Sequence, residues 1–532
     1  MRRMPSNYVL QRIQPISSPH PLVRIDCGQG GISLPKHLPI FYSALLLTLV
    51  NLLLRFVGTT FQVYISSVLG AAGVGLLQLV MSVGSLALVA GMAGIRTATM
   101  YLTAEELGRG KPKNVTWVLS GCFLYSILCS GSVAFLIYRF APLIAERWIG
   151  NSQTVDALRL FAAFLPVTCL CGVMTGYFTA ANRIGTLAAV EVAEQFASMA
   201  VTTASLTLWA GTDAGRACQS VILGSCAGAC LTLLCLIVLR IRENAGQAAK
   251  IPVRSRLFSA AVPLAMADVL KSGITTTENL MVPKRLALNN SVISPLAAFG
   301  MVSGMVFPIL MFPACILFAL AELLIPELAR CAAAGSRQRI IYLVRRSLKV
   351  SMLYGLLFGG FLFLLAEDLC QAIYRSSEAG AILKRYALLV PMLYCDATVD
   401  AMTKGLGQQK ACVRYNILTN AIDVGFLYFL LPKYGMDGYY FSFLITHALN
   451  FCLSLRRLLK ITSLTLPCHI PLLSAAAAIS AAWGCRFLSV PALQIAAYPA
   501  LLFNAMYLLG ILGREDLRWV RGLIRKNDLT FR

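Results

Sequence analysis

Apolar runs long enough to cross a lipid bilayer recur along this chain from Leu38 to Leu512. A hydrocarbon core about 30 Å thick requires about 20 apolar residues per helix, and these runs have that length. Composition agrees, because 58% of the 532 residues are hydrophobic and 13% are charged. Since a segment in lipid must satisfy its own backbone hydrogen bonds, the sequence predicts an all-α polytopic membrane protein.

We expect about fourteen transmembrane helices, with both ends of the chain in the cytoplasm of a bacterial-type plasma membrane. The expected spans are 38–62, 74–98, 115–138, 157–181, 188–210, 217–239, 257–281, 296–325, 347–366, 382–404, 414–432, 436–456, 467–487 and 491–512. This topology places most Lys and Arg residues in cytoplasmic segments, and the opposite orientation would place them outside. The net charge of +23 is thereby explained by topology, and we expect no nucleic-acid partner.

The spans divide into two lobes of six helices followed by two C-terminal helices. The expected divisions are a polar N-terminal segment at 1–37 without a cleaved signal peptide, an N-lobe at 38–240, a basic cytoplasmic linker at 241–256, a C-lobe at 257–460, a final helix pair at 461–512, and a basic tail at 513–532. We expect the tail to lie on anionic lipid headgroups.

The two lobes resemble distant copies of each other. Residues 160–166 match residues 385–391, and residues 180–182 match residues 405–407 at the same offset of 225. Each copy also has a Gly-containing basic loop, at 108–113 and at 335–339. An even number of spans per copy makes the repeats parallel, an arrangement in which transporters bind substrate between two halves that rock alternately.

Polar side chains at helical spacing form stripes inside several spans. A charge at the bilayer centre costs about 2.5–3.5 kcal/mol, so each such residue needs a partner, water or a function. The candidates for lining a substrate cavity are Asn51, Arg55, Thr59, Gln62, Gln78, Lys271 and Thr275. The candidates for ion coupling or charge balance are Glu278, Asp268, Asp396, Asp400, Asp423 and Glu191.

Each stripe also has a structural interpretation. Asp268 and Lys271 are spaced for an ion pair within one helix, and Arg55 is suited to bind carbonyl groups or an acid of another helix. Arg96 and Glu194 lie near the cytoplasmic ends of their spans, where long side chains reach the interface. The stripes of the first, second and seventh spans together still favour a shared aqueous cavity, because each of them needs a wet side.

The chemistry of these residues leaves two substrates open. An Arg side chain can bind phosphate oxygens in a bidentate fork, which suits the diphosphate of a polyprenyl-linked saccharide. The surplus of acids in the later spans suits Na⁺ or H⁺ coupling, or a cationic substrate.

Motifs of soluble enzymes are lacking in the sequence. It has no GxxxxGK[ST] phosphate loop, no HExxH motif and no CxxC pair among its 17 cysteines. We therefore expect no enzymatic activity, no cofactor and no metal centre.

Several segments resemble the stage V sporulation protein B family. They occur in the family's order across nearly the whole chain and are Arg55–Gly58, Leu69–Gly75, Gly94–Ile95, Ala104–Gly110, Gly176–Phe178, Glu278–Leu286, Pro313 and Leu324–Glu327. This family lies in the multidrug/oligosaccharidyl-lipid/polysaccharide (MOP) flippase superfamily, together with lipid II flippases and MATE antiporters. Two departures are Arg96, where many members have proline, and Asp268, where some have arginine.

The resemblance implies a two-lobed, fourteen-helix fold that exports a lipid-linked saccharide, with a peptidoglycan precursor for the spore cortex or cell wall as one such substrate. It implies a headgroup contact at Arg55 and an acid at Glu278. The alternatives are a MATE-type antiporter coupled to cations, with drugs or metabolites as substrates, and a scaffold of wall synthesis that transports nothing.

Overall fold

The computed structural model describes residues 40–109, 113–210, 213–242, 253–465, 469–488 and 491–513. These residues form helices and short connections and no strand. The all-α prediction is confirmed. The expected N-terminal segment, most of the basic linker and all but the first residue of the basic tail lie outside the described residues.

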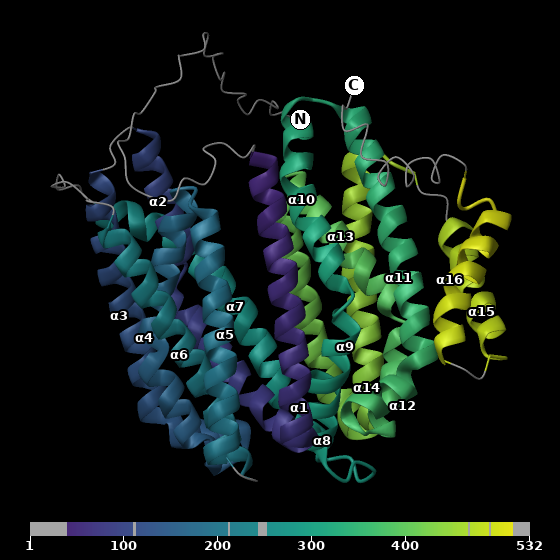
Figure 1. Ribbon diagram of the computed structural model, residues 1–532, viewed down its shortest axis with the longest axis horizontal. Coiled ribbons are helices and arrows are strands. Elements are labelled where there is room, and N and C mark those ends of the chain that lie inside the picture. The colour runs from purple at the N-terminus through teal and green to yellow at the C-terminus, as the bar shows by residue number, and fades with distance from the viewer. Residues whose placement is uncertain are drawn as a thin grey trace, which may run out of the picture.

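The first half of the chain contains α1 to α6, shown at the left and centre of Figure 1. Their bounds are α1 Ile40–Met92, α2 Ile95–Gly108, α3 Asn114–Leu143, α4 Val155–Ala180, α5 Ile184–Ser205 and α6 Ala214–Ile241. α3 continues into the π-helical turn η1 (Ile144–Ile149), η2 (Ser152–Thr154) is a 3-10 turn that leads into α4, and α5 continues into the π-helical turn η3 (Leu206–Ala210).

The second half begins with α7 and ends with the separate pair α15 and α16 at the right of Figure 1. The bounds are α7 Val253–Leu286, α8 Pro295–Gly300, η4 Met301–Val306, α9 Phe307–Met311, α10 Ala314–Ala333, α11 Arg337–Tyr374, α12 Ser377–Ala387, α13 Val390–Gly405, α14 Gln409–Thr462, α15 His469–Cys485 and α16 Pro491–Leu508.

Several helices are longer than the expected spans, α15 and α16 are shorter, and two helices contain a sharp bend. α1 covers the first two expected spans and bends at Gly70, and α14 covers the eleventh and twelfth and bends at Gly435. Both glycines have a positive φ, of 68° and 55°, which residues with a side chain rarely adopt. The sequence prediction missed this continuity because glycine and polar residues at a bend look like a loop.

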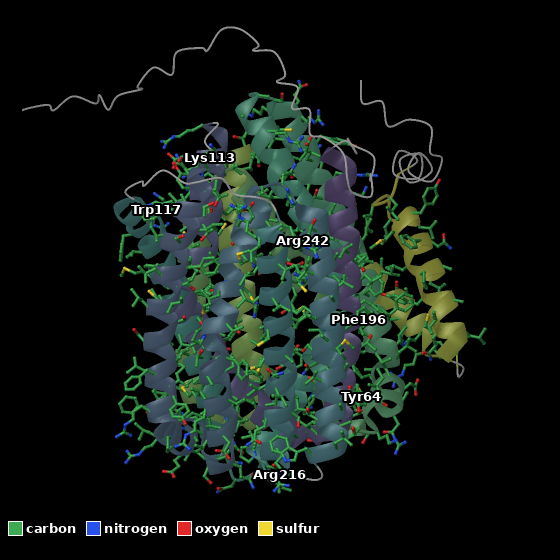
Figure 2. The ribbon with its side chains drawn as sticks, turned by 60° about the vertical axis from the view of Figure 1, so that its left-hand side comes forward. Tyr64, Lys113, Trp117, Phe196, Arg216 and Arg242 are labelled. Atoms are coloured by element: carbon green, nitrogen blue, oxygen red, sulfur yellow. The ribbon has the colours of Figure 1, made fainter. Side chains whose placement is uncertain are left out.

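Among the described residues, five helical segments are long and apolar enough to cross a membrane, or six if the bent pair Pro295–Met311 and Ala314–Ala321 counts as one. The total of fourteen crossings and their orientation stay predictions. Lys113, at the start of α3, and Arg216, at the start of α6, lie at opposite ends of the molecule in Figure 2, as expected when successive membrane-spanning helices alternate in direction. Large apolar side chains such as Trp117 and Phe196 are exposed on its outside, as expected for a surface that faces lipid.

The internal repeat is visible in the turns that end matching helices. Gly150 and Arg375 have φ angles of 83° and 55°, and Asn182 and Gly407 have φ angles of 58° and 77°. Within each pair the second residue follows the first by 225 residues, the offset found in the sequence. Two left-handed turns at one spacing support a common design for the two halves.

The halves pack tightly at the lower end of Figure 1, where α1 bends beside α8. A Cβ atom added to Gly300 would lie 2.0 Å from the carbonyl oxygen of Ala71, and one added to Gly75 would lie 2.3 Å from that of Leu296. The Ser66 hydroxyl donates a hydrogen bond of 2.9 Å to the Gly304 carbonyl. Only glycine permits backbones to approach this closely, so this end is closed.

α7 contacts both halves. Near its start, Leu257 and Ala261 are buried in a cluster with Ile95 and Leu102 of α2, and farther along it packs against α14. This position places its polar side chains between the two halves.

Candidate functional site

The predicted polar stripe of α7 is divided between two environments. Asp268, Lys271 and Thr275 are exposed, whereas Glu278 is half-buried. No ion pair joins Asp268 to Lys271 in the described part of the chain, so the intrahelical pair is not formed. Thr275 donates a hydrogen bond of 3.3 Å to the Lys271 carbonyl.

Two neighbours of Glu278 bind the second arm of α1. Thr276 donates to the Ser82 carbonyl at 3.0 Å, and the Asn279 amide donates to the Ser82 hydroxyl at 2.9 Å. These side chains were not among the predicted site residues. They hold α7 against the first half of the chain. At 100° per residue, Glu278 points about 130° away from the mean direction of these two side chains around the helix axis.

Glu278 meets Asp423 of α14, and the two carboxyl groups are within hydrogen-bonding reach of each other. Asp423 is buried and accepts hydrogen bonds from the Ser442 and Thr446 hydroxyls, the latter at 3.2 Å. Two carboxylates in contact repel each other strongly, so a shared proton or a bound cation stabilises the pair. The sequence predicted both acids as candidates but did not predict that they pair.

The bend of α14 at Gly435 makes this arrangement possible. It folds the helix into an antiparallel hairpin, and a Cβ added to Gly438 would lie 2.7 Å from the Leu430 carbonyl oxygen. Ser442 and Thr446 on the second arm therefore face Asp423 on the first. His447, Tyr386 and Tyr439 lie close to Asp423 as well.

The polar face of the second arm of α14 extends beyond the acid pair. Ser442, Thr446, Asn450 and Ser454 are all buried and recur at every fourth residue. This spacing puts them on one side of the helix, and it could have identified the face from sequence.

The two acids of α13 lie next to this polar face. The Asn450 amide donates to both oxygens of Asp396, at 3.1 and 3.3 Å. Asp400, one turn farther along α13, forms an ion pair of 2.6 Å with Lys404.

The acids of the first half have different partners. Glu191 on α5 lies close to Arg96 of α2, and Glu194 accepts a hydrogen bond of 2.7 Å from Thr232 of α6. Of the predicted ion-coupling candidates, Glu191 thus lies beside a base, and Asp268 is away from the acid pair.

The first arm of α1, which contains Arg55 and Thr59, faces α10 and α5. The Arg55 guanidinium is 5.2 Å from the centre of the Phe318 ring, and Gly58 lies near Gln195. Thr59, Gln62 and Gln78 are half-buried, and the amide nitrogen of Gln62 is buried without a hydrogen-bond partner. The side chain of Asn51 lies outside the described residues. No direct contact joins Arg55 to Lys271 in the described part, and a shared cavity remains a prediction.

An apolar groove, which the sequence analysis missed, lies between α11, α13 and the pair α15 and α16. Its volume is about 1070 Å³, and apolar side chains such as Leu356, Ala478 and Tyr498 line it. Its lining runs along α11 from Arg345 to Leu364, about 29 Å at 1.5 Å per residue, which equals the hydrocarbon core.

Basic side chains lie at both ends of this groove. Arg345 and Lys349 line one end, and Lys384 and Arg486 line the other. Lys384 also forms an ion pair with Glu367 at 2.8 Å. Such a groove can take a long hydrocarbon chain and offers an anionic headgroup a partner at each membrane surface.

A metal centre is not evident. Among the described residues, no group of three or more His, Cys, Asp or Glu side chains is arranged to hold a metal ion.

The bent α1 and α14 and the repeated halves form a fold similar to that of solved transporters of the MOP superfamily. Residues 47–208 match the MatE family. Stage V sporulation protein B of Bacillus subtilis (strain 168) is 23% identical over 413 residues, which cover 74% of this chain and 78% of that protein. The resemblance expected from the sequence is confirmed.

Solved structures agree on the fold. The lipid II flippase MurJ in an inward closed conformation has a TM-score of 0.64 at 14% identity and covers 90% of this chain and 100% of its own. A multidrug resistance MATE family transporter of the MOP superfamily, in an inward-facing conformation, has a TM-score of 0.62 at 12% identity, with 79% and 100% covered.

Proposed function

We propose that this protein moves a polyprenyl-diphosphate saccharide across the plasma membrane by alternating access, driven by a cation gradient. The apolar groove carries the proposal, since it matches the hydrocarbon core in length and has basic residues at both ends. A lipid whose headgroup crosses the membrane has its tail near one membrane surface before transport and near the other afterwards, so a groove that spans the hydrocarbon core can hold the tail in both states. The saccharide would cross between the halves while the tail stays in lipid or in the groove.

Arg55 and Lys271 are the headgroup contacts of this proposal. Arg55 is an exposed cation on α1, the helix that lies between α5 and α10. Its guanidinium can bind a diphosphate in a bidentate fork. The similarity to the lipid II flippase MurJ supports this substrate class, and a peptidoglycan precursor is the first candidate to test.

Glu278 and Asp423 are the coupling residues of the proposal. Their shared site can hold one proton or one Na⁺ ion, with the Ser442 and Thr446 hydroxyls as further oxygen ligands. Asp268, which is exposed and distant from the pair, is left as a charge-balancing residue.

A MATE-type antiporter is the second candidate function. The same acid pair favours it, because cation coupling needs buried acids and makes no demand for a lipid groove. The match of residues 47–208 to the MatE family supports it too.

A binding screen on the purified chain separates the two functions. Lipid II, other polyprenyl-diphosphate glycans and organic dye cations are compared by native mass spectrometry. The flippase proposal expects a glycan lipid to bind and Arg55→Ala to weaken it by about ten-fold or more, since a charge-assisted bidentate contact is lost. Arg139→Ala, at an exposed arginine of α3, serves as control. Binding of dye cations alone would support the antiporter instead.

A further inference from the structure

Polar side chains of α13 and α14 form a descending series between the acid pair and one end of these helices. At 1.5 Å per residue, Asp423 lies about 21 Å along α14 from its start at Gln409, and Asn450 lies about 18 Å from its end at Thr462. Asp396 and Asp400 lie about 14 and 8 Å from the end of α13 at Gly405. Lys404 lies at the end of the series.

Each step of the series is a contact or a single helical turn. Asp423 binds Thr446, and Thr446 precedes Asn450 by one turn of α14. Asn450 binds Asp396, and Asp396 precedes Asp400 by one turn of α13. Side chains four residues apart are neighbours on a helix surface, so the polar face is continuous.

Two oxygens along this series have no donor. Asn450 is 93% buried, with 7% of its surface exposed, and its amide oxygen has no hydrogen-bond partner in the described part of the chain. The same holds for one buried oxygen of Asp400. A buried acceptor left unsatisfied costs about 1–3 kcal/mol, so these oxygens are suited to a transient cation.

We propose that Asp396, Asn450 and Asp400 form a passage for a monovalent cation between the Glu278–Asp423 pair and the solvent at Lys404. This inference rests on the proposed cation coupling and adds the route by which the ion reaches its site. Lys404 closes the mouth through its ion pair with Asp400. A cation that displaces the Lys404 ammonium meets Asp400, then Asp396 with Asn450, and then the acid pair.

The passage predicts that Asp396 controls the rate of ion exchange rather than the affinity of the acid pair. Asp396→Asn removes the charge and keeps the shape. The assay uses proteoliposomes of the full chain and follows ²²Na⁺ exchange, or proton exchange with an entrapped pH-sensitive dye. The exchange rate should fall by about ten-fold or more, because the ion loses a charged partner along its route. Equilibrium ²²Na⁺ binding or proton uptake by the purified variant should stay within about two-fold of wild type.

Matched variants separate this route from a structural role. Asp396→Glu should restore exchange in part, and Asp368→Asn, at an exposed acid of α11, should leave it unchanged. Asn450→Leu gives a second test if Asp396→Asn does not fold, and it should slow exchange in the same way.

Three results would overturn the proposal. Wild-type exchange in Asp396→Asn would exclude the route while the acid pair still stood. Equal loss of binding and exchange would make Asp396 a part of the binding site or of the fold. A wild-type protein that takes up neither Na⁺ nor protons would overturn the proposed coupling and the route with it.

Discussion

The two halves of this protein share a fold and treat their buried acids differently. In the first half Glu191 lies near both Arg96 and Glu194, and Glu194 accepts a hydrogen bond from the Thr232 hydroxyl. In the second half Glu278 and Asp423 lie against each other. Arg96 balances part of the charge around Glu191, whereas two acids in contact need a proton or a cation from outside. Under the proposed coupling, we therefore expect structural acids in the first half and coupling acids in the second.

The repeat shows how this difference arises. At the offset of 225 residues, Asp423 corresponds to Ser198 of α5. At the same offset Glu278 corresponds to Leu53 of α1, so the first half lacks both members of the pair. Two positions thus distinguish the acid pair of the second half from the uncharged side chains of the first.

The largest expected effect comes from breaking the acid pair. Asp423→Asn should reduce cation-driven transport about a hundred-fold or more, or about 2.7 kcal/mol at 1.36 kcal/mol per factor of ten. Glu191→Gln should reduce it less than about three-fold, since Glu191 only balances Arg96. Initial rates of gradient-driven uptake in proteoliposomes measure both. Equal losses in the two variants would erase the distinction between the halves.

Filling the groove beside α15 should have the next largest effect. Ala478→Trp places a large ring against α11 and should lower translocation of a lipid-linked saccharide about ten-fold, because overpacking excludes a chain from the groove. Leu472→Trp, on the same helix but not in the groove lining, should have little effect. Equal losses from both tryptophans would mean that α15 acts only through stability.

Loosening the closed end should have a moderate effect. Gly300→Ala forces a methyl group against the Ala71 carbonyl and should cost about 1–3 kcal/mol, as overpacking does. Gly131→Ala, where a Cβ would meet nothing within 4 Å, should cost nothing or stabilise α3. Thermal unfolding in detergent compares the two. An unchanged midpoint for Gly300→Ala would show that this end is not tightly closed.

The smallest effect is expected at an exposed ion pair. Arg385 and Asp437 are 63% and 62% exposed and form a contact of 2.5 Å. Arg385→Gln should change the free energy of unfolding by about 0–1 kcal/mol, since water screens exposed pairs. A larger loss in chemical denaturation would give this exposed pair a structural role.

Helix positions and acid candidates could be read from the sequence because each depends on local spacing. The pairing of Glu278 with Asp423 could not, since the residues are 145 positions apart and meet only after α14 bends at Gly435. The same limit hid the groove, which forms when α15 and α16 dock against α11. The face containing Ser442, Thr446 and Asn450 was within reach, because its four-residue spacing is a local pattern.

The most direct test of the whole account is translocation by the purified chain in proteoliposomes. A fluorescent polyprenyl-diphosphate saccharide is placed in one leaflet, and its appearance in the other is followed with an impermeant quencher. The account predicts translocation that depends on a Na⁺ or H⁺ gradient and is lost in Asp423→Asn but kept in Glu191→Gln. Translocation that ignored the gradient, or efflux of organic cations with no movement of the saccharide lipid, would contradict it.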